Sequence, residues 1–144
     1  MGIQEIYEQY HAEIKFLNIY IREAHPIDGW WLGRRLTKPI IQRIFPYPKA
    51  SMEHYDPKTI EERRAVAGEC ETALQYGVRT YVDEMVDRVN RAYAAWPTGL
   101  YLIGLVGKVV YGGGLGPYDF KPAKLNAAID EYLSELTLVK NDDI

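Results

Sequence analysis

The chain has 144 residues, of which 47% are hydrophobic, 12% aromatic and 26% charged, and its formal net charge at pH 7 is −3. This balance excludes an intrinsically disordered chain, and 12 glycines are too few for a collagen-like repeat. One domain with one hydrophobic core is expected. The apolar stretches are far shorter than the ~20 residues of a membrane-spanning helix, and no signal-peptide pattern opens the chain, which predicts a soluble, cytoplasmic protein without a transmembrane segment.

Cys70 is the single cysteine of the sequence. An intrachain disulfide, a Cys-x-x-Cys redox pair and a zinc site made of several cysteines are therefore excluded within these residues. His11 and His54 have no partner at the spacing of metal ligands, so we predict neither a metal nor a cofactor.

A helix and a strand open the chain. Apolar side chains recur at spacings of three and four within Gln4–Ile14, which is the period of an amphipathic helix. Phe16–Ile21 (FLNIYI) is short, apolar and rich in β-branched and aromatic residues. This composition predicts a strand that is buried on both faces of a sheet.

The next segment, Gly29–Met52, carries five basic residues and no acidic one, which leaves eight excess negative charges on the rest of the chain. Because it also contains three prolines, we expect a loop or insertion at about 32–55. Its cations, together with Trp30, Trp31, Phe45 and Tyr47, could contact a nucleic acid, an anionic membrane or an acidic protein. A solvated loop that packs its rings on the body explains the same pattern.

A second helix is expected at Ile60–Leu74. Thr59 is a typical N-cap residue, Glu62 completes a capping box, and Gly77 follows the end of the helix. The later elements are a strand at Arg79–Val82, a helix at Val86–Ala95, strands at Leu100–Ile103 and Lys108–Tyr111 joined as a hairpin, and a final helix that starts at Pro122. Strands separated by helices predict parallel pairing, so the order indicates an α/β protein with a mixed sheet flanked by helices.

Several motifs occur in an order that resembles one known family. They are YIREAHPIDGWW at Tyr20–Trp31, TIEERRAVA at Thr59–Ala67, YVDEM at Tyr81–Met85, and RAYAAWPTGLYLIG followed by YGGGLGPYDFKP. Over roughly Phe16–Leu136, apart from the insertion, the chain resembles the iodothyronine deiodinases and their bacterial relatives. The resemblance implies a single thioredoxin-like domain over residues 1–144.

The resemblance also implies a reaction and a set of site residues. The family removes halogen reductively with a selenocysteine, or in relatives a cysteine, at the end of a strand that precedes the first helix. His25 matches the histidine of the EAHP motif and is the predicted catalytic residue, acting in proton transfer or substrate contact. Tyr20 and Glu23 match residues that line the pocket, and Pro97 matches the cis-proline that precedes the hairpin. These three form the predicted substrate-binding set.

Two positions depart from the family pattern. Pro57 stands where the family has a second histidine, with His54 three residues away, and Leu115 stands where some members have an arginine.

The nucleophile-bearing strand of the family has no counterpart in the printed sequence, because that strand would precede Met1. We therefore expect a sheet that lacks its central strand, whose neighbours would expose unpaired backbone groups. Three outcomes follow: FLNIYI pairs directly with LYLI, another chain donates the strand, or the gene product starts upstream.

Three other features have a functional and a structural interpretation. Cys70 could be a redox thiol, but it shares a helical stripe with Ala67 and Leu74, which favours packing. The glycines at 112–116 invite a phosphate-loop interpretation, yet the P-loop pattern is absent and a turn is expected. The adjacent acids Asp83 and Glu84 could orient an imidazole, although solvated surface residues are the favoured interpretation.

Two functions remain open from the sequence. The first is a deiodinase-like redox domain that is catalytically incomplete as this chain, acting on a small-molecule substrate with a thiol reductant. The second is a non-catalytic binding or assembly module whose basic insertion contacts a protein partner or an anionic surface. In either case we expect a homo-oligomer or a subunit of a complex, and no nucleic-acid partner.

Overall fold

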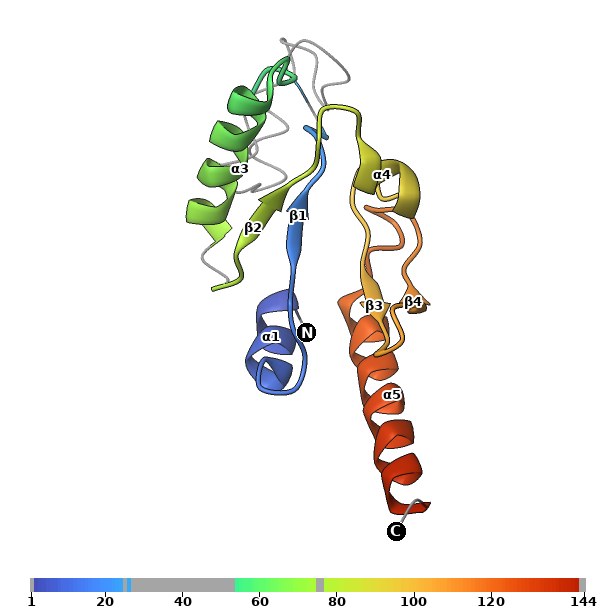
Figure 1. Ribbon diagram of the computed structural model, residues 1–144. Coiled ribbons are helices and arrows are strands. Elements are labelled where there is room, and N and C mark those ends of the chain that lie inside the picture. Colours follow the sequence, from blue (N-terminus) through green and yellow to red (C-terminus); the bar gives the residue numbers. More distant parts are fainter. Residues whose placement is uncertain (1, 25, 27–53, 75–76, 143–144) are drawn as a thin grey trace. The chain divides into compact units, whose positions relative to one another are not determined.

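The fold is described by a computed structural model for residues 2–24, 26, 54–74 and 77–142 (Figure 1). Its elements are α1 (Ile3–Tyr10), β1 (Asn18–Tyr20), α3 (Ile60–Leu74), β2 (Thr80–Val82), α4 (Arg88–Tyr93), β3 (Tyr101–Ile103), β4 (Val109–Gly112) and α5 (Pro122–Asp142). They form two compact units, Phe16–Trp96 and Met1–Lys15 together with Pro97–Ile144. The protein is a mixed α/β structure of helices and small sheets, consistent with the predicted thioredoxin-like fold.

The unit of residues 16–96 is built on a strand–helix–strand motif. β1 and β2 pair in parallel with Asn18 opposite Thr80, and the Asn18 side-chain amide donates to the Thr80 hydroxyl over 3.0 Å. α3 lies beside this pair and contacts β2 (Figure 1). The Glu71 carboxylate of α3 accepts the Thr80 N–H at 2.6 Å. Because the strands are parallel, the segments that follow β1 and β2 start at the same edge of the sheet.

α3 has the bounds that the sequence predicts. The Thr59 hydroxyl accepts the N–H of Glu62 at 3.2 Å, and the Glu62 carboxylate accepts the N–H of Lys58 at 2.7 Å. The second bond of the capping box is therefore made one residue earlier than in the ideal motif. Val66 and Ala67 are buried on the inner side of the helix.

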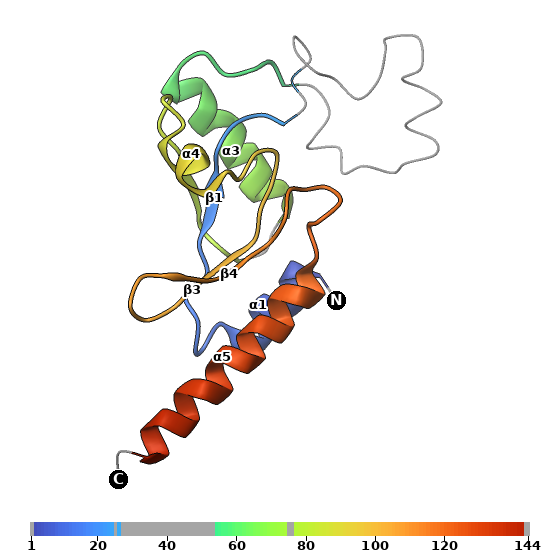
Figure 2. The same cartoon turned by 90° about the vertical axis from the view of Figure 1, so that its right-hand side faces the viewer.

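The other unit combines a hairpin with α1 and α5. β3 and β4 are antiparallel, and Gly107 in their turn has a φ of 75°, which glycine adopts without strain. α5 packs against both strands and buries Leu125 and Ile129 (Figure 2). Although α5 has 21 residues, neither it nor any other described helix is both long and apolar enough to cross a bilayer.

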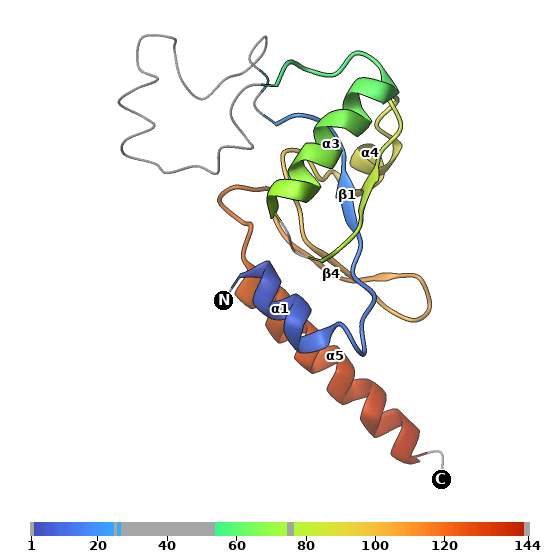
Figure 3. The same cartoon turned by 90° about the vertical axis from the view of Figure 1, so that its left-hand side faces the viewer.

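α1 lies along α5 (Figure 3). It buries Ile6 and Tyr10, two residues of the predicted helical stripe. The Tyr10 hydroxyl donates to Asp130 Oδ1 of α5 at 2.6 Å. A polar bond between two helices therefore supplements the apolar contact.

β1 differs from the expected strand. It spans three residues, and the flanking Leu17 and the central Ile19 are 60% and 38% exposed, so the prediction of a strand buried on both faces is wrong. A strand is buried on both faces when it lies inside a sheet that helices cover on both sides. Among the described residues β1 pairs with β2 alone.

The described strands form two separate two-stranded sheets, β1–β2 and β3–β4. Direct pairing of FLNIYI with LYLI, one of the three expected outcomes for the missing central strand, is therefore wrong for these residues. A strand donated by another chain and an upstream start both stay predictions.

The predicted cis bond at Pro97 is also wrong. In the part of the chain that the structure describes, the cis bond joins Gly116 to Pro117, so the bond before Pro97 is trans. The trans isomer of an X–Pro bond is favoured by about 0.5–1 kcal/mol, and tertiary contacts that the order of residues does not specify can reverse this preference.

Candidate functional site

The predicted site begins at the carboxyl end of β1. The hydroxyl of Tyr20, the last residue of β1, donates to Glu23 Oε2 over 3.0 Å. Burial, together with the charge and hydrogen bond of Glu23, raises the pKa of Tyr20. The phenol is therefore a neutral donor throughout the physiological pH range. His25, the predicted catalytic residue, lies outside the described residues, two positions beyond Glu23.

Cys70 of α3 lies near enough to this pair that its thiolate form would raise the pKa of Tyr20. Burial raises the pKa of the Cys70 thiol, and the negative charges of Glu23 and Glu69 raise it further. Because the thiolate is the nucleophilic form of cysteine, a thiol that holds its proton at neutral pH is a poor nucleophile. The environment of Cys70 favours packing over attack on a substrate.

We expect Cys70 to react with iodoacetamide more slowly than an unstructured cysteine peptide at about pH 8, because less thiolate is present. Replacing Glu23 by glutamine removes one of the charges that raise the pKa of Cys70, so the rate should increase. Mass spectrometry of the alkylated chain measures both rates. Glu61→Gln, at an exposed position of α3, is the control and should leave the rate unchanged. An equal increase of the alkylation rate in both variants would contradict the conclusion that the charge of Glu23 raises the pKa of Cys70.

The raised pKa values also predict how stability changes with pH. Tyr20 and Cys70 hold their protons more tightly in the folded chain than at their ordinary pKa values of 10.0 and 9.0. Their contribution to the unfolding free energy is therefore fully present below pH 9, and it is lost as the pH rises through the folded-state pKa values. Urea denaturation across the alkaline range should show this decline, and Tyr20→Phe combined with Cys70→Ser should flatten it.

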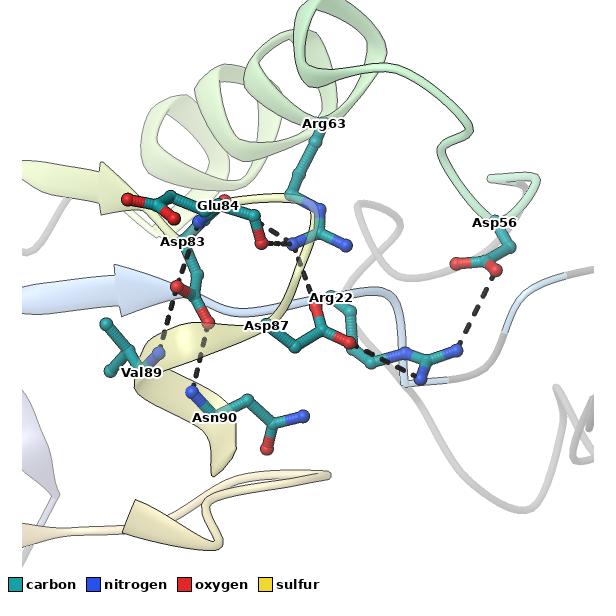
Figure 4. A network of polar contacts seen from close by, with 8 residues as sticks. All are labelled: Arg22, Asp56, Arg63, Asp83, Glu84, Asp87, Val89 and Asn90. Carbon is teal, nitrogen blue, oxygen red and sulfur yellow. Dashed lines mark hydrogen bonds and ion pairs between the residues drawn. The ribbon is translucent and has the colours of Figure 1, made fainter. Parts of the chain in front are cut away.

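A buried arginine holds the segment that follows β2. Arg63, in the first turn of α3, is 3% exposed. Its Nη1 donates to the main-chain oxygens of Asp83 and Glu84, at 3.4 and 2.8 Å, and to Asp87 Oδ1 at 3.0 Å (Figure 4). One buried side chain therefore links α3 to the turn between β2 and α4.

Asp87 connects this arginine to the segment that follows β1. Its Oδ2 lies 3.8 Å from Arg22 Nη1, and Arg22 Nη2 lies 3.7 Å from Asp56 Oδ2 (Figure 4). Asp87 has a φ of 54°, a left-handed conformation that aspartate adopts more readily than most residues. Since Arg22 directly precedes Glu23, the network ties the candidate site to α3 and α4.

Asp83 has a structural role that the sequence did not reveal. It is 3% exposed, and its carboxylate accepts the N–H groups of Glu84, Val89 and Asn90 at 2.9, 3.0 and 3.0 Å (Figure 4). The expectation that Asp83 is a solvated surface acid is therefore wrong. The first turn of α4 has N–H groups without helical acceptors. Asp87 stands at the N-cap position, but its side chain contacts the arginines and makes no capping bond, so the Asp83 carboxylate supplies the acceptors instead.

An open hollow of about 500 Å³ lies at the start of α3. Its wall consists of Tyr55, Asp56, Pro57, Lys58, Glu62, Ala65 and Val66. Asp56 belongs to both the hollow and the ion-pair network, and Lys58 Nζ lies 3.5 Å from its carboxylate. The hollow therefore adjoins the network that holds the candidate site.

The two described histidines contact residues near them. The ring of His11 packs against Tyr7 with centroids 5.4 Å apart, and His54 Nε2 lies 3.5 Å from Glu69 Oε2 on α3. Within residues 2–24, 26, 54–74 and 77–142, no group of three or more His, Cys, Asp or Glu side chains is arranged to hold a metal ion.

The structure therefore brings together two of the predicted site residues, Tyr20 and Glu23, and Pro97 belongs to the other unit. Sequence reasoning missed Arg63. A signal was present, because Arg63 stands three residues after Ile60 and four before Ala67, on the apolar stripe of the predicted helix. A charged residue at such a position indicates a buried ion that needs partners.

Comparison with known proteins gives a consistent picture. The family model described as iodothyronine deiodinase matches residues 2–133. Thyroxine 5-deiodinase of Aquarana catesbeiana is 35% identical over 124 residues, which are 85% of this chain and 39% of that protein. The enzymes of that name from Ovis aries and Homo sapiens are each 29% identical over 135 residues, covering 94% of this chain and 40% and 39% of theirs. The chain thus spans about two fifths of the length of these curated relatives.

Proposed function

Because this chain belongs to the iodothyronine deiodinase family, we propose that it acts in the reductive dehalogenation of an iodinated aromatic compound. The observation that carries the proposal is the Tyr20–Glu23 pair at the carboxyl end of β1, two positions before His25 in the sequence. Ligand sites of α/β proteins gather at this end of parallel strands. A phenol, a carboxylate and an imidazole there can position a substrate and move a proton.

The reaction replaces a carbon–iodine bond by a carbon–hydrogen bond. A selenol or thiol takes the iodine and forms a selenium–iodine or sulfur–iodine bond, while the carbon receives a proton. Two molecules of a thiol reductant then become a disulfide, which restores the selenol or thiol and releases iodide and a proton. In this scheme His25 delivers the proton to carbon, while Tyr20 and Glu23, which a hydrogen bond joins, contact the substrate.

The nucleophile in this scheme is a group other than Cys70. The raised pKa of Cys70 keeps its sulfur protonated, and the side chain lies in an environment that favours packing. We therefore expect the purified chain to be catalytically incomplete, with His25, Tyr20 and Glu23 supplying the proton-handling part of the site.

Binding and turnover of thyroxine test the proposal separately. Equilibrium dialysis should show saturable binding, weakened by about two- to tenfold in Tyr20→Phe, which loses one hydrogen bond. Tyr118→Phe is the matched control, because Tyr118 is 90% exposed. Iodide release with dithiothreitol should not exceed that of the thiol alone, with or without Cys70→Ser. Absence of binding, or iodide release that Cys70→Ser abolishes, would overturn the proposal.

The remaining expectations stay predictions. This function is compatible with assembly as a homo-oligomer or as a subunit of a complex. It is also compatible with a thiol reductant as partner and with a cytoplasmic location. A binding or assembly module that uses the basic insertion is the alternative, and its segment lies outside the described residues.

A further inference from the structure

The turn between β3 and β4 carries two aliphatic residues at its centre. The Gly107 N–H donates to the Gly104 oxygen over 2.9 Å, which makes residues 104–107 a β-turn around Leu105 and Val106. We call these two central residues the hairpin tip. Both side chains are 81% exposed. Because Gly, Pro, Asn, Asp and Ser usually occupy such positions, two adjacent aliphatic side chains there serve something other than the turn itself.

The backbone around the hairpin tip is held by hydrogen bonds within the protein. The Gly104 N–H donates to the Lys108 oxygen, and the Leu105 N–H donates to the Tyr132 hydroxyl of α5, each over 2.8 Å. A Cβ at Gly104 would come within 2.8 Å of the same hydroxyl, so glycine permits this close approach. With the Gly107 bond, three N–H groups of the turn have acceptors that are not water. The tip can therefore leave water without losing these bonds.

The apolar surface continues from the hairpin tip onto the strands. Ile103, Val109 and Val110 are between 42% and 51% exposed. Lys108 is the single charged residue of the sequence within 97–118. A long cationic side chain beside apolar residues can extend toward water while its methylene groups stay in an apolar environment. The hairpin therefore presents an apolar end with one cation next to it.

We propose that the hairpin tip inserts into the interfacial region of a phospholipid bilayer. A stable protein interface buries about 800 Å² on each partner, and two aliphatic side chains supply only part of that area. A bilayer needs no complementary hollow to receive the free end of a hairpin (Figure 2). Glu131 and Glu135 on α5 limit the attraction of anionic lipids, so the contact is mainly apolar. The tip includes neither Tyr20 nor Glu23, so the proposal is independent of dehalogenation.

Sedimentation with sucrose-loaded vesicles of phosphatidylcholine and a minor share of phosphatidylglycerol measures the contact. Leu105→Ser combined with Val106→Ser should lower the partition coefficient by about tenfold, because both inserted side chains are lost. The matched control is Leu138→Ser combined with Val139→Ser on α5, an adjacent pair that is 65% and 61% exposed. It removes the same two side chains and should leave the coefficient within about twofold of the wild type.

Tryptophan fluorescence provides a second readout of the same contact. The emission that Val106→Trp adds to the wild-type spectrum should shift to shorter wavelength with vesicles and be quenched by brominated phosphatidylcholine. The emission added by Tyr118→Trp, at a position 90% exposed, should do neither. Absence of vesicle binding, or an equal loss in the two serine variants, would overturn the proposal. Lipid-free association of the chain that the tip variant alone abolishes would also overturn it, and would assign the tip to a second copy.

Discussion

Replacing Arg63 by methionine is expected to lower the free energy of unfolding by about 3 kcal/mol, the lower end of the range for breaking a buried ion pair by removing one partner. The side chain is buried, and its loss leaves the carbonyl oxygens of Asp83 and Glu84 without their donor. The estimate is at the lower end because Asp87 keeps its contact with Arg22. Urea denaturation followed by circular dichroism measures the change.

Arg64→Met is the matched control for this experiment. Arg64 is the next residue of α3 and is exposed, so its replacement should change the unfolding free energy by no more than about 0.5 kcal/mol. Arg63→Lys, which keeps a cation near Asp87, should fall between the two. Equal effects of the Arg63 and Arg64 substitutions to methionine would show that the buried contacts contribute little stability.

The helix α3 and the β3–β4 hairpin could be predicted because their determinants are local. The side chains of Thr59 and Glu62 cap the helix within four residues of its start. Gly104 and Gly107 close the hairpin turn by a bond between their own backbones, from the Gly107 N–H to the Gly104 oxygen. Such contacts join neighbouring residues, so the order of amino acids largely specifies them.

The burial of Arg63 and Asp83 depends instead on residues that lie far apart in the sequence. Arg63 meets the turn after β2 some twenty residues later, and nothing in the motif TIEERRAVA specifies that partner. The motif resemblance placed Tyr20 and Glu23 in one pocket, and they are only three positions apart in the sequence. The same resemblance predicted a cis bond before Pro97, whereas this bond is trans, because the isomer depends on packing.

Replacing Asp83 by alanine is expected to cost about 2–4 kcal/mol of unfolding free energy, since three N–H groups lose a buried acceptor and water can satisfy only part of them. Two of these groups, those of Val89 and Asn90, belong to the first turn of α4. Hydrogen exchange of these two amides should therefore accelerate more than exchange in β1 or α3. Asp83→Asn, which keeps one acceptor oxygen, should lose less.

Glu84→Ala is the control that distinguishes the loss of a helix cap from the loss of a negative charge. Glu84 also carries a carboxylate, but it is exposed and pairs with Arg88, four residues further along the chain, at 3.3 Å. An exposed ion pair of this kind contributes at most about 1 kcal/mol. Its replacement should leave the exchange of Val89 and Asn90 unchanged. If Asp83→Ala lowers stability without affecting these amides, the carboxylate does not cap α4, and the loss arises from its burial beside β2. Faster exchange confined to α4 would instead identify Asp83 as the residue that holds this helix against the end of β2. Because β2 pairs with β1, Asp83 would then also support the segment that carries Tyr20 and Glu23.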